Sequence, residues 1–396
     1  MITLDTALTL IRERIQPVGS ETVALEDARR RRLALPLHAR RTQPSFDASA
    51  MDGYAIRSAD MTGESVSLSL SGESAAGHAS TRRVGPGEAF RISTGAPMPD
   101  GADQVVIQEN CTRMGDQIET SEPARPSANI RKAGIDFFEG DLLLEQGHRV
   151  TATALSLAAS AGLIEIVVSR QPRIGLLSTG DELVAIGEDT GPDQIINSLA
   201  PGLGAQILDW GGQPEFLGIA RDDPADVRKK LSASKGLDLL VTIGGASVGD
   251  HDHLRSVFAD MGGQLVFEKI AIKPGKPTWF GQLGATHVLG LPGNPVSAMV
   301  MAQLCLKPAM DKLLGIEMPA LFLDAPLSVD LPANGPRENM IRARFDRKTG
   351  CVAPLRNQDS SALSALAASN ALIRRSANAG PAKAGESVDY LPLDHE

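Results

Sequence analysis

The chain has 396 residues, of which 42% are hydrophobic and 22% are charged. This composition is typical of a globular protein with several cores and excludes a disordered chain. At about 100–200 residues per domain, the length predicts two to four domains. Acids outnumber bases by 48 to 39, the net charge is −9 and aromatic residues make up only 4%. Because nucleic-acid binding needs a basic face or stacking aromatics, we expect no nucleic-acid partner.

The cysteines and the N-terminus bear on the compartment. Cys111, Cys305 and Cys351 are scattered and form no CxxC pair, which argues against a disulfide framework and a structural zinc site. The N-terminal stretch carries acids and no long apolar run, and no segment approaches the ~18 apolar residues of a membrane span. We therefore expect a cytoplasmic protein that does not enter a membrane.

The N-terminal region predicts two helices. The first has apolar residues at helical spacing, namely Leu4, Leu8, Ile11 and Ile15. The second is expected over residues 25–35 and stops before Pro36. The basic run at residues 29–32 then falls within this helix, where it is expected to form a solvated face.

The pattern changes after residue 42. Residues 66–70 alternate between apolar residues and serine, which predicts a strand. Glycine and proline punctuate the surrounding sequence, so residues 43–137 are expected to form a β-rich inserted domain. A helical pattern returns at residues 153–161. Residues 138–170 are therefore expected to pack with residues 1–42 as one discontinuous helical domain.

Strands and helices alternate along residues 171–318, which predicts a doubly wound, mostly parallel sheet covered on both faces. In such sheets the ligand crevice lies beyond the carboxyl ends of the strands. Residues 319–396 contain short strands punctuated by prolines and predict a small C-terminal domain of β-barrel type. The expected fold class is therefore α/β multidomain.

A glycine-rich segment, residues 244–252, follows a buried strand of this α/β region. Glycine allows backbone amides to approach an anion closely, and a helix N-terminus adds favourable potential. Gly244, Gly245 and Ser247 are therefore predicted to cradle a phosphate or another oxyanion. The alternative is a tight turn that simply needs glycine. Neither a Walker loop nor a GxGxxG motif is present.

Three lysines fall within eight residues at Lys269, Lys273 and Lys276. Lys269 and Lys273 share one face of an expected strand, and Pro274 and Pro277 stiffen the loop that carries Lys276. Ammonium groups are compact charges suited to phosphate or another small dianion. A surface charge run is the alternative, but the apolar flanks favour a binding function.

Carboxylates follow three strands of the predicted sheet at Glu182, Asp222 and Asp252. Because converging carboxylates can share Mg²⁺ with bound phosphates, these three are candidate magnesium ligands. Asp223 precedes Pro224 and is instead expected to be a helix N-cap. Pro292 and Pro295 form either a shaped wall for a flat ligand or a rigid connection between strand and helix.

Seven segments resemble, in order, the MoeA family of molybdopterin molybdenumtransferases. They are SAMDGYA at 49–55, STGAPMP at 93–99, NIRKAGID at 129–136, STGDEL at 178–183, GGASVGDHD at 244–252, KIAIKPGKP at 269–277 and GLPGNPVSA at 290–298. Read alone, the first three are typical of turns. The resemblance covers nearly the whole chain, and the final domain is the least similar. The chain also departs from the family by having Ile243 where serine usually precedes the two glycines.

The resemblance implies an elongated four-part subunit, a head-to-tail homodimer and the final step of molybdenum cofactor synthesis. In that step molybdate and adenylylated molybdopterin are substrates, Mg²⁺ is required, molybdenum enters the dithiolene and AMP is released. The functional positions that the resemblance carries over are Asp52, Thr94, Asp136, Glu182, Asp222, Asp252, Lys269, Lys273, Pro292 and Pro295. The family's site lies between subunits, so Asp52, Thr94 and Asp136 would face the α/β domain of a second chain.

Two alternatives remain. One is adenylylation of molybdopterin, as in the MogA family that shares the α/β domain, although the additional domains argue against it. The other is a non-catalytic scaffold for partner peptides, as in gephyrin, although the intact acidic and basic set argues against it. Expected protein partners are a molybdopterin adenylyltransferase and proteins of molybdoenzyme maturation.

Overall fold

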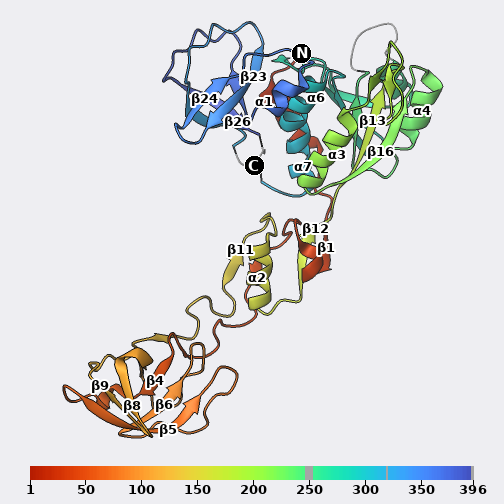
Figure 1. Cartoon of the computed structure of the whole chain (residues 1–396). Coiled ribbons are helices and arrows are strands. Elements are labelled where there is room, and N and C mark those ends of the chain that lie inside the picture. Colours follow the sequence, from red (N-terminus) through yellow and green to blue (C-terminus); the bar gives the residue numbers. More distant parts are fainter. Residues whose placement is uncertain (246–252, 318–319, 394–396) are drawn as a thin grey trace.

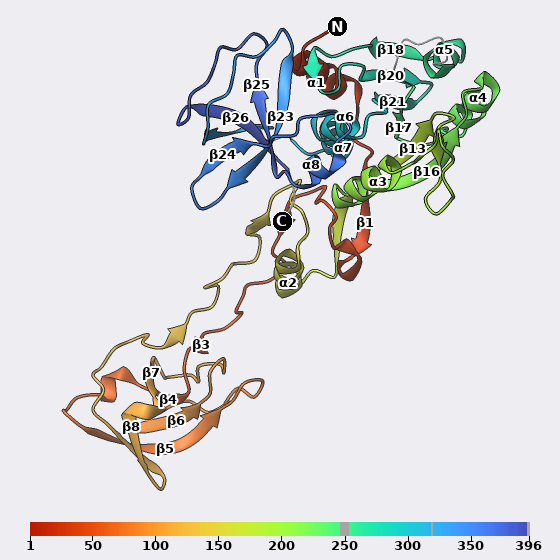
Figure 2. The same cartoon turned by 45° about the horizontal axis from the view of Figure 1, so that its top comes forward.

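The computed structural model describes residues 1–245, 253–317 and 320–393. The molecule is elongated, with a β-rich domain at one end, a narrow middle domain and a broader body at the other end (Figures 1 and 2). The body contains an α/β domain and a C-terminal domain that lie side by side. Among the helices of the described ranges, none has the length and apolar character that crossing a membrane requires. The α/β multidomain fold class is confirmed.

The β-rich domain is built on a six-stranded sheet in the order β7-β4-β6-β5-β9-β8. The strands are β4 (Gly53–Ile56), β5 (Val66–Ser74), β6 (Glu88–Ile92), β7 (Gln104–Ile107), β8 (Cys111–Met114) and β9 (Gln117–Thr120). The strand predicted over residues 66–70 is confirmed within β5. Two short paired strands, β3 (Ala48–Ser49) and β10 (Ile130–Arg131), lie where the chain enters and leaves the domain.

The middle domain consists of two strand pairs and one helix. It contains β1 (Ser20–Ala24), β12 (Glu165–Ser169), β2 (Leu37–His38), β11 (Leu142–Leu144) and α2 (Ala152–Ser160). Helix α2 fits the helical pattern expected near residues 153–161. Its buried side chains join Leu33, Val150 and Val168 in a small separate core.

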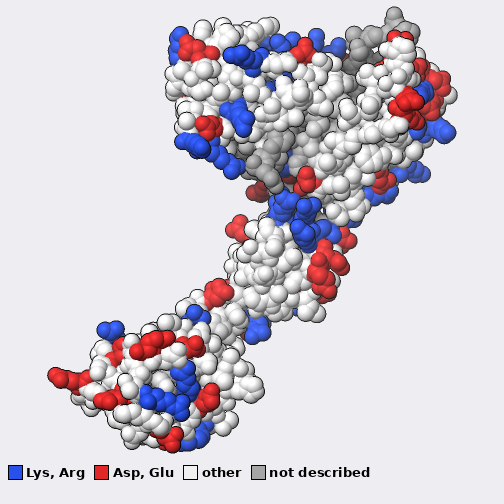
Figure 3. All heavy atoms as spheres, in the orientation of Figure 1, with Lys and Arg blue, Asp and Glu red and all other residues white. Residues whose placement is uncertain are grey.

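The helix expected over residues 25–35 is wrong. Only the single turn η1 (Leu25–Ala28) is helical, because β1 pairs with β12 and Leu33 bridges to Val168. The basic run is therefore not a solvated helix face. Arg31 donates a hydrogen bond to the Ser169 carbonyl over 2.8 Å, and Arg32 donates one to the Gly147 carbonyl over 3.2 Å. Lys and Arg side chains gather where the middle domain joins the body (Figure 3).

The α/β domain has a six-stranded sheet in the order β16-β13-β17-β21-β20-β18. The strands are β13 (Arg173–Thr179), β16 (Gln213–Ala220), β17 (Leu239–Ile243), β18 (Gln264–Phe267), β20 (Trp279–Leu283) and β21 (Thr286–Leu291). The first four in sheet order are parallel, β20 runs antiparallel to them, and β18 runs antiparallel to β20 and so in the direction of the first four. A two-stranded parallel pair, β14 (Leu183–Val184) and β15 (Ile195–Ile196), lies outside the sheet.

Helices cover both faces of this sheet, as expected. One face carries α3 (Leu199–Asp209), α6 (Pro295–Met301), a π-helical turn (Ala302–Leu306) and α7 (Lys307–Leu313). The other face carries α4 (Pro224–Ser232) and α5 (His253–Asp260). Successive side chains of a strand point to opposite faces of the sheet, so each face has its own core. Leu176 of β13 is buried in the core under the first group of helices, and Leu177 is buried in the core under α4 and α5.

Helix α1 (Leu4–Arg14) forms where its apolar spacing predicts a helix, but it packs in an unexpected place. Leu4, Leu8 and Ile11 are buried in the core of the α/β domain, among residues of α7. The expected packing of residues 1–42 with residues 138–170 therefore does not hold for α1. The apolar stripe specifies a buried face but not the partner that covers it.

The C-terminal domain is a curled sheet in the order β19-β23-β25-β26-β22, with β24 pairing β23. Its own elements are β22 (Leu323–Pro326), β23 (Glu338–Asp346), β24 (Cys351–Pro354), α8 (Leu363–Ala367), β25 (Ala371–Arg375) and β26 (Ser387–Pro392). The strand β19 (Ile272–Lys273) comes from the α/β region and pairs in parallel with β23. This shared strand joins the two parts of the body.

The chain passes between body and middle domain twice, and one guanidinium group holds both passages. Arg170 makes a two-pronged ion pair with Asp238, with N–O distances of 2.8 and 3.2 Å, and donates a hydrogen bond to the Val18 carbonyl over 3.2 Å. The adjacent Ser169 hydroxyl donates to the Leu314 carbonyl over 2.7 Å. Side chains and backbone of the body thus hold the start of the middle domain.

Gly53 in β4 predicts a stability effect. A Cβ atom at this position would lie 2.0 Å from the Val106 carbonyl oxygen of β7, and backbone cannot yield as a flexible side chain does. We expect Gly53→Ala to destabilise the β-rich domain by roughly 3 kcal/mol. Faster hydrogen exchange in β4, β6 and β7 would report this loss.

Gly63→Ala is the matched control in the same domain, because its Cβ would meet no atom closer than 3.5 Å. We expect its exchange pattern to match the wild type. Equal protection of β4 in both variants would contradict the steric argument.

Candidate active site

A pocket of about 670 Å³ opens at the carboxyl ends of the parallel strands β13, β17 and β21. The in-register pairs Ser178–Ile243 and Ile243–Leu291 bring these strand ends to one level. The residues that follow the strands line the pocket. The chain leaves β13 for β16 on one side and then crosses to β17 on the other side of β13. The strand ends at this reversal form a topological switch point, where α/β sheets bind ligands.

Gly244 and Gly245 form the floor of this edge with left-handed backbone angles, φ being 89° and 58°. A Cβ on Gly244 would lie 2.8 Å from the Thr179 carbonyl oxygen, and one on Gly245 would lie 2.9 Å from the Thr179 hydroxyl. The turn therefore requires both glycines even without a ligand, which agrees with the alternative that this segment is a tight turn. The same residues also line the pocket. Ser247 and Asp252, predicted as site residues, lie outside the described residues.

Two helices begin at the pocket, and their ends differ. The first turn of α6 is closed, because Pro295 has no N–H and the Val296 amide donates to the Ser360 carbonyl over 3.2 Å. Within the described part of the chain, no side chain caps the start of α3 at Ser198. The amides of Leu199 and Ala200 are therefore free to donate to an anion, whereas Pro201 in the same turn has no N–H.

Neighbouring side chains hold the start of α3 against the sheet. The Ser178 hydroxyl at the end of β13 donates to the Asn197 side-chain oxygen over 3.0 Å, and the Asn197 amide donates to the Val184 carbonyl over 2.9 Å. Asn197 and Ser198 both line the pocket. The strand end and the helix start thus form one continuous wall.

Glu182 is the single ionisable side chain among the described residues that line the pocket. Asp222 is exposed outside this lining, and its amide donates to the Asp181 carboxylate over 3.2 Å. The prediction that Asp223 is a helix cap is confirmed, because its carboxylate accepts the Asp226 amide over 3.0 Å. Among the described residues, no three His, Cys, Asp or Glu side chains lie close enough together to hold a metal ion.

The expectation that Lys269 and Lys273 share a strand face is wrong. Strand β18 ends at Phe267, the Lys269 carbonyl accepts the Ile2 amide over 3.0 Å, and Lys273 lies in β19 beside β23. Contacts with the N-terminus and with the C-terminal domain thus divide the segment. The three lysines are not among the lining residues, but Pro277, next to Lys276, is one of them, so the segment borders the pocket.

The predicted residues of the β-rich domain form a second group. One Asp52 carboxylate oxygen accepts the Thr94 amide over 2.7 Å and the Thr94 hydroxyl over 3.1 Å. These two hydrogen bonds hold the pKa of Asp52 below its ordinary value. The Asp136 amide donates to the Gln43 carbonyl over 3.2 Å. In one chain this group lies at the opposite end of the molecule from the pocket (Figure 1).

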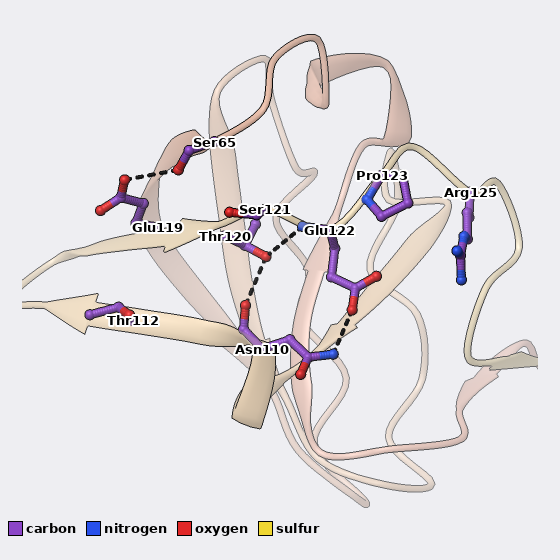
Figure 4. Close-up of a pocket in the computed structure, with 9 residues that line it drawn as sticks. All are labelled: Ser65, Asn110, Thr112, Glu119, Thr120, Ser121, Glu122, Pro123 and Arg125. Carbon is purple, nitrogen blue, oxygen red and sulfur yellow. Dashed lines mark hydrogen bonds between the residues drawn. The ribbon is translucent and has the colours of Figure 1, made fainter.

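A separate pocket of about 560 Å³ lies in the β-rich domain (Figure 4). Its polar side chains bond mainly to one another. The Ser65 hydroxyl donates to Glu119 over 2.8 Å, the Thr120 hydroxyl donates to the Asn110 carbonyl over 2.9 Å, and the Asn110 amide pairs with Glu122. None of the predicted site residues that the structure describes lines this hollow. The sheet edge of the α/β domain is therefore the better candidate.

Sequence reasoning missed several parts of the pocket. Asn197 and Ser198 follow the short β14–β15 pair, for which the sequence carries no clear signal. Ser361 comes from the C-terminal domain and reaches the pocket only through the docking of two domains. The local signal that could have pointed to Ser198 is a serine directly before a helical pattern, since serine often begins a helix.

Comparisons with known proteins agree along the chain. Residues 2–162 match the MoeA N-terminal region (domain I and II), residues 175–312 match a probable molybdopterin binding domain, and residues 324–393 match the MoeA C-terminal region (domain IV). A molybdopterin molybdenumtransferase of Haemophilus influenzae is 37% identical over all of this chain and 99% of its own length. One of Bacillus subtilis is 32% identical over 95% of this chain and 90% of its own.

Solved structures give the same answer. A crystal structure of a molybdopterin biosynthesis MoeA protein from Pyrococcus horikoshii matches 99% of this chain and 100% of its own length, with a TM-score of 0.86 and 26% identity. The family regions follow one another in the order that the seven sequence segments predict. The chain therefore belongs to the MoeA family.

Proposed function

We propose that this chain is a molybdopterin molybdenumtransferase, which uses molybdate and adenylylated molybdopterin and releases AMP as molybdenum enters the dithiolene. One observation carries the proposal: five residues predicted from the sequence, Glu182, Gly244, Gly245, Pro292 and Pro295, line one pocket at the switch point of the sheet. The full-length match to relatives of that name supports the same activity. The three cysteines are free, which suits the reducing cytoplasm where we expect the protein to act.

The pocket's donors suit the phosphate part of the substrate. The uncapped amides of Leu199 and Ala200 in α3 and the amide of Gly245 can donate to phosphate oxygens without bringing a full charge, whereas the Gly244 amide already donates to the Leu291 carbonyl over 3.1 Å. Lys276 lies next to Pro277 of the pocket lining, and Lys269 and Lys273 belong to the same segment. These lysines would supply the positive charge that attracts a pyrophosphate and molybdate. The proline-bounded turn at residues 292–295 would form a rigid wall beside the pterin.

The carboxylates suit a magnesium ion that is held jointly with the substrate. Because the described residues offer no three-ligand cluster, such an ion would take most of its oxygens from phosphate and water. Glu182 would complete the coordination shell of this ion, together with Asp222 and Asp252, which follow other strands of the sheet in the sequence. The ion would polarise the phosphoanhydride bond that is broken when AMP leaves.

Asp52, Thr94 and Asp136 require a second copy of the chain if they act at this pocket. Large apolar side chains are exposed around them: Phe46 is 43%, Met51 41%, Ile135 64% and Phe138 57% exposed. Exposed apolar groups of this kind mark interaction surfaces. We therefore propose a homodimer in which the β-rich domain of one subunit meets the pocket of the other.

Reconstitution tests the activity. With adenylylated molybdopterin and Mg²⁺ we expect AMP release that depends on added molybdate. Folded protein that releases no AMP with molybdate would contradict the proposal. Consumption of ATP with molybdopterin would favour the adenylyltransferase alternative. Protein that shows neither activity but binds peptides would favour a scaffold.

Mixed subunits test the shared site. We expect Asp52→Ala and Glu182→Ala to be inactive as separate dimers. Random mixing gives half mixed dimers with one intact site each, so AMP release should return to about a quarter of the wild-type rate. Mixing Glu182→Ala with Lys273→Ala is the control and should recover nothing, because both changes fall in the same half of the site. No recovery in the first mixture would exclude a site shared between subunits.

Thr94 predicts a pH effect at Asp52. Its hydrogen bonds lower the pKa of Asp52, so the stabilised carboxylate is present at neutral pH and is lost as the pH falls through that lowered pKa. Thr94→Ala removes the hydroxyl bond and leaves the backbone bond, so we expect the pKa of Asp52 to rise toward its ordinary value. Carboxyl ¹³C NMR titration measures it. Ser93→Ala is the control, and an unchanged pKa in Thr94→Ala would contradict the prediction.

A further inference from the structure

A turn of the C-terminal domain, residues 359–361, forms part of the pocket in the α/β domain. Ser361 lines the pocket beside the start of α6. Two hydrogen bonds between the domains hold the turn there: the Val296 amide donates to the Ser360 carbonyl over 3.2 Å, and the Asn294 side-chain amide donates to the Ser360 hydroxyl over 3.3 Å. The turn therefore keeps a fixed place relative to the strand ends.

Asp359 fixes the orientation of Ser361 within this turn. One Asp359 carboxylate oxygen accepts the Ser361 amide over 2.8 Å and the Ser361 hydroxyl over 2.6 Å. The same two bonds, led by that of the hydroxyl, lower the pKa of Asp359, so the group is an ionised acceptor at neutral pH. Because the hydroxyl proton is committed to Asp359, the Ser361 oxygen offers only lone pairs to the pocket.

We propose that Ser361 is a substrate-binding residue whose hydroxyl oxygen accepts a hydrogen bond from an N–H or O–H group of the bound pterin nucleotide, and that Asp359 is its positioning residue. This inference rests on the proposed function, and it adds a contact from the C-terminal domain. The oxygen acts as an acceptor beside amides that act as donors. A ligand with phosphates at one end and hydroxyl or ring N–H groups at the other satisfies both sets.

Docking alone is the competing explanation of this turn. Domain docking uses Ser360, through its carbonyl and hydroxyl, whereas Ser361 makes no hydrogen bond across the domain boundary within the described part of the chain. Removing the Ser361 hydroxyl therefore leaves both interdomain bonds in place. A change at Ser361 can separate ligand binding from docking.

Steady-state kinetics of Ser361→Ala tests the proposal. We expect KM for adenylylated molybdopterin to rise about five-fold with kcat nearly unchanged, as for a contact made equally in the bound substrate and in the transition state. Ser364→Ala is the matched control, because Ser364 is exposed in the same domain and does not line the pocket. Its KM should equal that of the wild type, and the melting temperature of both variants should be unchanged.

Variants of Asp359 test the positioning role. Asp359→Ala frees the Ser361 side chain and should raise KM at least as much as Ser361→Ala, and the double variant should add little more. Asp359→Asn keeps an oxygen that can accept both bonds, so most of the wild-type KM should return. A purely structural role would instead lower the melting temperature of Asp359→Ala and leave KM unchanged.

The outcomes separate this inference from the proposed function. If the wild type releases AMP and Ser361→Ala keeps its KM, the inference is wrong and the function stands. If the wild type shows no molybdate-dependent release, the function fails, and a binding titration with adenylylated molybdopterin then decides the inference. Equal dissociation constants for wild type and Ser361→Ala would overturn the inference, and several-fold weaker binding by Ser361→Ala would support it.

Discussion

The pocket depends on the level alignment of three parallel strands. Ser178, Ile243 and Leu291 lie side by side in register at the ends of β13, β17 and β21, so the next residues of all three strands meet at one edge. The turn after β17 fits there only because Gly244 and Gly245 lack side chains that would collide with Thr179. A ligand at this edge therefore meets backbone groups first. The three lysines at residues 269–276 lie outside this lining.

The remaining parts of the body arrange themselves around that edge. The lysine segment is held from two sides, by Ile2 of the N-terminus and by β23 of the C-terminal domain. The turn at residues 359–361 docks on the start of α6 from the same domain. The C-terminal domain thus contacts both flanks of the pocket. A domain that carries none of the seven sequence segments thus contributes Ser361 to the pocket lining.

The sequence predicts what depends on local periodicity and on chain order. Helix α1, strand β5 and the cap at Asp223 form as their patterns indicate, since each depends on neighbours close in sequence. The glycines and prolines of the pocket were also found, because their place after buried strands specifies one sheet edge. Prediction failed where distant segments pair. The β1–β12 pairing replaced the expected helix at residues 25–35, and Ser361 reaches the pocket only through domain docking.

Arg170 lies at the junction between the body and the narrow middle domain, about which the rest of the molecule could rotate. The β-rich domain lies far from this junction (Figure 1), so a small rotation at the junction displaces Asp52 by a large distance. The ion pair of Arg170 with Asp238 and its hydrogen bond to the Val18 carbonyl limit that rotation. The stiffness of this junction therefore limits how far the β-rich domain can swing relative to the body.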